Sequence, residues 1–439
     1  MQPYALAPLL TEKDPAESAE GGLDPLGTEP LADALATRLA PGVRERMSHP
    51  RFLTAIAVSL EVCRDFDDET IASDQVSEPW QVFEWYLVEG LVRTTESGNR
   101  LGLPGSLKAS RAIADGVPLS AKRYLKTPTV FGFNGVYRQL ARTLGIEESG
   151  RLGETGFQLL SAWAKDQGLE GFCGTAAGPG REVRDQLVAA VRDGLEKAAT
   201  DRSSGWSGWE FFSEHLAPYT ARRGESRFIA SALLADPKGF RREIIESLVS
   251  SGGRRAWEAH NSEREFHEAL RRNASDGLAL LLDAIDAYET LSRLCEDAFR
   301  DCLYELTRQG AKKTPPSVLA RSPAVKTASE RVPAMFGDVM ARLEPLGEAA
   351  RFRDTLAGLA ENGTPPEWTQ RLIEHHQRTQ RQKPPTGKNP WFEQFDDGSL
   401  IIRPDYRTDE TGSHDSSYVH LFRTRPLWDF ANDLGIVKS

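Results

Sequence analysis

The chain has 439 residues, of which 39% are hydrophobic and 27% are charged. These proportions are typical of a globular protein with roughly two to four domains. The net charge of −10 excludes a protein whose whole surface attracts nucleic acid. No apolar run reaches the roughly 18 residues that a membrane-spanning helix needs, and the first residues do not have the basic and apolar regions of a signal peptide. We therefore expect a cytoplasmic protein without a membrane partner.

The four cysteines are far apart in the sequence, at Cys63, Cys173, Cys295 and Cys302. None has the Cys-x-x-Cys spacing of a zinc site, and free thiols are usual in the reducing cytoplasm. The sequence also has no G-x-x-x-x-G-K-[ST] or G-x-G-x-x-G nucleotide motif and no G-x-S-x-G hydrolase motif. We expect neither a metal nor a cofactor.

The first part of the chain predicts a flexible leader followed by helices. Residues 1–30 are rich in Pro, Gly, Glu and Ala without apolar periodicity, which indicates a flexible leader. In residues 78–92, EPWQVFEWYLVEGLV, Pro79 suits a helix start, and the aromatic and aliphatic residues form a broad apolar face. Shorter helical patterns cover residues 106–114 and 119–125.

The stretch FGFNGVYRQLARTLGIEESGRLGETGFQLLSAW, residues 131–163, predicts a helix, a hairpin and a second helix. Asn134 is a suitable N-cap for the first helix, and Gly145 is a suitable end for it. An extended segment then begins, Ser149-Gly150 suits a tight turn, and Arg151-Leu152 begins the return strand.

The sequence LGETGFQLL, residues 152–160, resembles the Leu-Thr-x-x-Gly-x-x-Leu-Leu pattern of many winged helix-turn-helix proteins, with Gly153 in place of the usual Thr. Together with the order helix, hairpin, helix, this makes residues 78–167 similar to a winged helix-turn-helix domain, within a helical region of residues 31–170. The resemblance implies a DNA-binding module whose helix over 134–144 enters the major groove. Because glycine loosens a chain, we expect the change at Gly153 to loosen the wing.

Basic residues gather in the same part of the chain. Residues 93–151 contain ten Lys or Arg and four Asp or Glu, a local charge of +6 in a chain of net charge −10. Asn and Gln can pair with adenine edges, Arg can pair with guanine, and Lys or Arg can bind phosphates. The residues expected to contact double-stranded DNA are Lys122, Arg123, Lys126, Asn134, Arg138, Gln139, Arg142 and Arg151.

Two more helical regions follow. Residues 181–310 predict a central helical domain, in which residues 276–308 form the longest uninterrupted helical pattern. Residues 311–390 predict a second helical region that contains a basic helix.

The last part of the chain, residues 391–439, predicts a small α+β element. Residues 395–404 suit a strand entered through an Asp-Gly turn, and the alternating residues 418–423 suit its partner strand. Residues 428–434 predict a closing helix.

The basic helix, over residues 367–381, offers a second kind of chemistry. It carries Arg371 and His376 at R-x4-H spacing, which is similar to the loose motif of HEPN-type ribonucleases. The resemblance implies that His376 transfers a proton near a ribose 2′-OH and that Arg371 stabilises charge. The same charges also suit an ordinary solvated helix face.

We therefore expect a mainly α-helical, multi-domain protein with a winged helix-turn-helix and a small C-terminal α+β element. The first expected function is a non-enzymatic DNA-binding subunit of a multi-protein bacterial complex, in which the acidic remainder binds other protein subunits. In size and in Arg- and Glu-rich composition the chain is similar to accessory proteins of bacterial phage-defence loci. Two alternatives stay open, a HEPN-like ribonuclease and an adaptor whose winged helix binds only protein.

Overall fold

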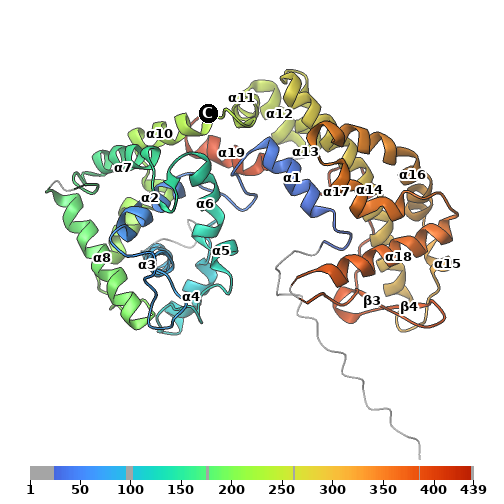
Figure 1. The fold of residues 1–439 in the computed structure, drawn as a ribbon, viewed down its shortest axis with the longest axis horizontal. Coiled ribbons are helices and arrows are strands. Elements are labelled where there is room, and N and C mark those ends of the chain that lie inside the picture. The colour runs from blue at the N-terminus through green and yellow to red at the C-terminus, as the bar shows by residue number, and fades with distance from the viewer. Residues whose placement is uncertain (1–23, 95–101, 175–176, 261–262, 385, 437–439) are drawn as a thin grey trace, which may run out of the picture. The chain divides into compact units, whose positions relative to one another are not determined.

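The computed structural model describes residues 24–94, 102–174, 177–260, 263–384 and 386–436. These residues form nineteen α-helices and two pairs of short antiparallel strands, with labels as in Figure 1. The mainly α-helical class is therefore confirmed, as is a small strand pair near the C-terminus. The chain divides into two compact units, which are described separately. Unit 1 comprises residues 1–35 and 262–420, and unit 2 comprises residues 36–261 and 421–439. Helix α1 (Glu29–Leu39) belongs in part to each unit.

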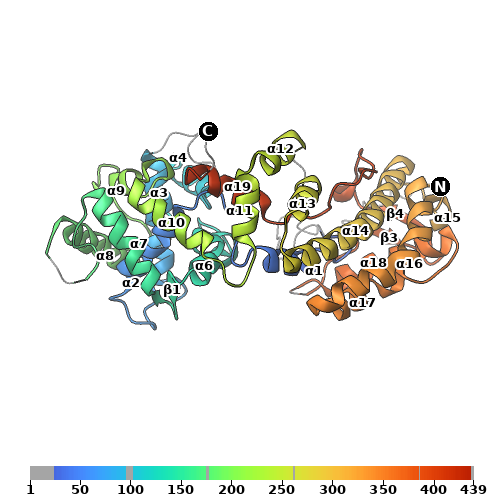
Figure 2. The same ribbon diagram turned by 90° about the horizontal axis from the view of Figure 1, so that it is seen from above.

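Unit 1 is built on α14 (Asp276–Gln309), the longest helix. Its sequence has no proline and no glycine after Gly277, so nothing interrupts the backbone hydrogen bonds over these residues. The apolar side chains along one face of α14 are buried. The helix packs along α16 (Pro323–Leu343), as Figure 2 shows. The other elements of unit 1 are α13 (Glu263–Arg271), α15 (Pro316–Leu319), α17 (Ala349–Leu356), α18 (Pro365–Gln382), β3 (Phe392–Gln394) and β4 (Leu400–Ile402).

The C-terminal strands differ from the prediction in their pairing. β3 pairs with β4, with Phe392 opposite Ile402. Residues 418–423 form no strand, because the Glu289 carboxylate accepts hydrogen bonds from the backbone of this segment. The predicted C-terminal element is also divided, since its strands belong to unit 1 and its helix α19 (Thr424–Asp433) belongs to unit 2.

The predicted leader differs from the structure in its last residues. Residues 1–23 lie outside the described residues, but residues 24–30 are packed into unit 1. Leu26 is buried, and its carbonyl oxygen lies 2.7 Å from Nε2 of His375 on α18. A histidine on a distant helix thus holds a segment whose own composition predicts flexibility.

Unit 2 is built around α2 (Phe52–Cys63), most of whose residues are buried. The predicted helix at residues 119–125 is absent, because the amide and carbonyl groups of Leu119 bind Thr200 instead. The other elements of unit 2 are α3 (Pro79–Thr94), α4 (Ser106–Ala114), α5 (Pro128–Phe131), α6 (Phe133–Thr143), β1 (Glu147–Glu148), β2 (Arg151–Leu152), α7 (Glu154–Gln167), α8 (Pro179–Lys197), α9 (Gly208–His215), α10 (Arg223–Leu234), α11 (Arg241–Val249) and α12 (Ser251–His260).

Candidate nucleic-acid interface

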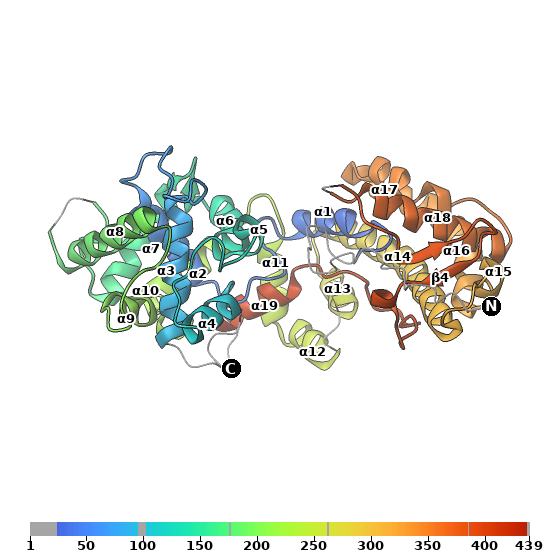
Figure 3. The same cartoon turned by 90° about the horizontal axis from the view of Figure 1, so that it is seen from below.

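Helix α6 is the element that the sequence predicts to contact DNA. Its apolar face packs on α2, where the ring centre of Phe52 lies 4.8 Å from that of Phe133 and 5.4 Å from that of Tyr137. The single turn α5 lies beside α6, as Figure 3 shows. The predicted order of helix, hairpin and second helix is present as α6, β1–β2 and α7.

The N-terminus of α6 is capped by a buried side chain from another helix. Asn134 is not the N-cap, because the helix begins one residue earlier at Phe133. Instead, the Glu84 carboxylate of α3 accepts hydrogen bonds from the amides of Phe133 and Asn134, both at 2.9 Å, and from the Tyr124 hydroxyl at 2.8 Å. Burial raises the pKa of Glu84 to about 7. Gly132 leaves room for this carboxylate, since a Cβ there would lie 2.3 Å from Glu84 Oε1.

The hairpin after α6 is short, with two residues in each strand. Its turn places Ser149 and Gly150 at positive φ, as its sequence predicts. Close packing explains why residue 153 is a glycine, because a Cβ at Gly153 would lie 2.4 Å from the carbonyl oxygen of Gly145. The absence of a side chain at residue 153 thus allows the strand to approach the end of α6.

Two of the arginines expected to read DNA share one carboxylate. Arg138 Nε lies 2.7 Å from the fully buried Glu147 carboxylate, and Arg142 Nε lies 3.0 Å from it. Arg151 at the hairpin lies 3.6 Å from Asp68. Each of these arginines is therefore partly neutralised by a neighbour, which reduces its attraction for phosphate.

The other predicted cations are exposed. Lys122, Arg123 and Lys126 come just before α5, and none of them pairs with a carboxylate of the described residues. Gln139 is exposed on α6, and Asn134 is half-buried.

Sequence reasoning missed two further cations, which a loop places beside α6. The loop of residues 42–49 follows the helix, since the amides of Ser48 and His49 donate to the Tyr137 hydroxyl. It carries Arg44 and Arg46, both exposed and without a described carboxylate partner. The Arg46 guanidinium lies 4.5 Å from the ring centre of Phe131 in α5. We call Arg44, Arg46, Lys122, Arg123 and Lys126 the cationic surface.

A groove of about 570 Å³ opens on another side of α6. It lies between the end of α2, the start of α3, α6 and the hairpin. Asn134 and Arg138 line it, whereas Gln139 and Arg142 do not. The predicted DNA-contacting residues of α6 are thus divided between the groove and the outer face of the helix.

The ribonuclease alternative depends on His376, which is fully buried. Its Nδ1 lies 2.8 Å from the Pro25 carbonyl oxygen, and its Nε2 accepts a hydrogen bond from the Trp391 amide at 3.0 Å. Burial lowers the pKa of this imidazole to about 3. Arg371 is engaged elsewhere, where it donates to the carbonyl oxygens of Glu361 and Asn362. His376 joins segments of the fold, and both of its ring nitrogens have hydrogen-bond partners within it.

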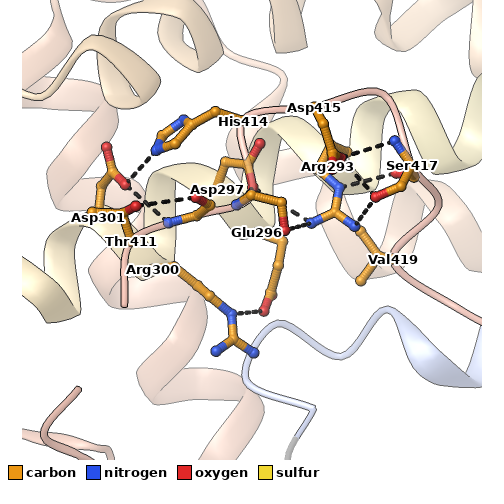
Figure 4. Close-up of polar contacts among 12 residues, drawn as sticks. Arg293, Glu296, Asp297, Arg300, Asp301, Thr411, His414, Asp415, Ser417 and Val419 are labelled. Carbon is orange, nitrogen blue, oxygen red and sulfur yellow. Dashed lines mark hydrogen bonds and ion pairs between the residues drawn. The ribbon is translucent and has the colours of Figure 1, made fainter. Parts of the chain in front are cut away.

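A dense polar cluster in unit 1 has a similar structural role (Figure 4). Arg293 of α14 donates to the carbonyl oxygens of Ser417 and Tyr418 at 3.0 and 2.9 Å. Asp297 and Asp301 accept from the amides of residues 413 and 412, at 3.0 and 3.1 Å. These side chains hold the irregular segment of residues 411–419 against α14.

His420 lies between a hydroxyl and a carboxylate, an arrangement also found in hydrolases. Its Nε2 is 3.1 Å from Thr28 Oγ1, and its Nδ1 is 2.6 Å from Glu289. Burial opposes the charged ring, but the hydrogen bond and charge of Glu289 raise the pKa of His420. The Asp24 carboxylate lies 3.4 Å from Thr28 Oγ1, where it would repel a developing oxyanion. The arrangement therefore suits a structural role, in which His420 connects Thr28 to Glu289.

Among the described residues, no three His, Cys, Asp or Glu side chains are grouped as metal ligands would be. In the same part of the chain, every helix is too short or too polar to cross a membrane. No protein-family model, curated protein or solved structure matches the chain.

Proposed function

We propose that unit 2 binds double-stranded DNA, mainly through phosphate contacts made by the cationic surface. The observation that carries this proposal is the exposure of five cations, two in the loop of residues 42–49 that contacts α6 and three in the segment just before α5, none paired with a described carboxylate. A cation without a carboxylate partner can bind a phosphate and release the counterions of DNA without first breaking an ion pair of its own. Each phosphate contact therefore favours binding.

The contribution of α6 itself is smaller in this proposal than the sequence predicts. Gln139 and Arg142 remain on the outer face, where they can reach base edges. Arg138 is turned to the groove and paired with Glu147. The α6 N-terminus does not offer its first amides to a phosphate, because Glu84 already accepts two of them. Phosphate contacts thus dominate base contacts, and binding is expected to depend little on DNA sequence.

A non-enzymatic subunit of a multi-protein bacterial complex, such as those of phage defence, fits a large acidic chain with one basic region. The Arg- and Glu-rich composition and the length of 439 residues, similar to those of phage-defence accessory proteins, support this setting.

The test is DNA affinity measured by fluorescence anisotropy with a labelled duplex. We expect Lys122→Ala/Arg123→Ala/Lys126→Ala to weaken binding on the order of 10²-fold at about 0.1 M salt. The matched control is Arg223→Ala/Arg242→Ala/Arg255→Ala, which removes the same charge from exposed positions on α10, α11 and α12. Equal affinities for the two triple variants, or no binding by the unaltered protein, would overturn the proposal.

A further inference from the structure

The groove beside α6 has aromatic and aliphatic side chains on both walls. Phe66 and Trp80 line one wall, and Leu152 and Phe157 line the other. Phe157 has 47% of its surface exposed although it lies in a helix with a well-packed opposite face. An exposed large apolar side chain inside a groove is typical of a binding surface rather than of isolated surface residues.

The loop along one side of the groove is strongly acidic. Residues 65–78 contain six Asp or Glu and no Lys or Arg, and residues from both ends of the loop line the groove. Asp67 and Glu69 are exposed and pair with no described cation. The same loop exposes Ile71 and Val76, the latter by 66%. The loop therefore presents negative charge and apolar surface together.

The cations in the groove do not balance these carboxylates, because each already has a partner. Arg64 lies 2.8 Å from Glu61, and Arg138 lies 2.7 Å from Glu147. Arg151 pairs with Asp68 of the acidic loop itself. The charge left over in the groove is negative, which repels a nucleic acid and attracts a basic partner.

We infer that this groove binds an extended segment of a partner protein in which Arg or Lys alternates with apolar side chains. The basic side chains would meet Asp67 and Glu78, which line the groove, and Glu69 of the adjoining loop, and the apolar ones would contact Phe157 and the aromatic residues Phe66 and Trp80. The volume suits a few residues of such a segment, because pockets of roughly 300–1,000 Å³ hold ligands of that size. The inference does not depend on DNA binding, since the groove and the cationic surface have no residue in common.

The test uses a fluorescein-labelled synthetic peptide in which Arg and Leu alternate. A second peptide, in which Glu replaces Arg, reports on charge. We expect the protein to bind the Arg peptide and not the Glu peptide, and binding to weaken as salt increases. Phe157→Ser should weaken binding about tenfold, because it removes an apolar contact of typical size. Asp67→Asn/Glu69→Gln should also weaken binding of the Arg peptide.

The controls carry the same changes at exposed positions of unit 2 outside the groove. Tyr219→Ser matches the loss of an exposed ring, and Asp201→Asn/Glu210→Gln matches the loss of two charges. The inference is overturned if the groove variants bind the Arg peptide as tightly as their controls do. It is also overturned if neither peptide binds, or if the Glu peptide binds as tightly as the Arg peptide. Duplex binding measured on the same variants should stay unchanged; loss of DNA binding by the groove variants would assign the groove to nucleic acid instead.

Discussion

At the residue scale, the Glu84 carboxyl group caps α6 and makes the stability of the folded state depend on pH. Its neighbours are two amides and the Tyr124 hydroxyl, and burial raises its pKa to about 7 from an ordinary 4.5. Between these values the folded chain holds a proton that the unfolded chain has released. The folded state therefore loses this part of its stability as the pH rises through the window from 4.5 to about 7.

We expect Glu84→Gln to remove this pH dependence, because the amide oxygen can still accept a hydrogen bond while the group no longer ionises. Relative to the variant, the unaltered protein should lose up to about 3 kcal/mol of unfolding free energy between roughly pH 4 and pH 8. Urea denaturation of both proteins at the two pH values measures the difference. A difference that does not change with pH would contradict the account.

At the scale of elements, the hairpin after α6 depends on a close approach of two backbone segments. A Cβ at residue 153 would meet the carbonyl oxygen of Gly145, at the end of α6. We expect Gly153→Thr, which introduces the residue that winged helix-turn-helix proteins usually have at this place in the pattern, to destabilise this protein by about 1–3 kcal/mol through overpacking. Chemical denaturation checks this, with Ser149→Gly as a control that relieves a positive φ in the same hairpin. A Gly153→Thr variant as stable as the parent would contradict the close approach of residue 153 to the Gly145 carbonyl group.

The sequence predicts the helices better than the contacts between them. Local patterns of apolar residues, Pro and Gly are enough to predict α3, α4, α14 and α18 close to their observed ends. The Glu84 cap and the Glu147 partner of Arg138 could not be predicted, because both depend on side chains brought together by the tertiary fold. For the same reason, pattern alone could not show that Arg46 lies beside α5 or that residues 418–423 bind Glu289.

At the scale of the whole molecule, charge is separated within an acidic chain. The net charge is −10, yet residues 93–151 carry +6, and unit 2 has both the cationic surface and the acidic groove. Most of the chain repels DNA, so the proposed binding is confined to one region and is sensitive to salt. A separate acidic groove in the same unit would let a basic protein segment bind without competing for that region.

The central claim is tested most directly by the salt dependence of duplex binding. If all five cations of the cationic surface contact phosphates, log K should fall against log salt with a slope of about −4.5. The variant Lys122→Ala/Arg123→Ala/Lys126→Ala should reduce that slope by about 2.7, and the α10–α12 control variant should leave it unchanged. A slope that is the same in all three proteins would contradict the account.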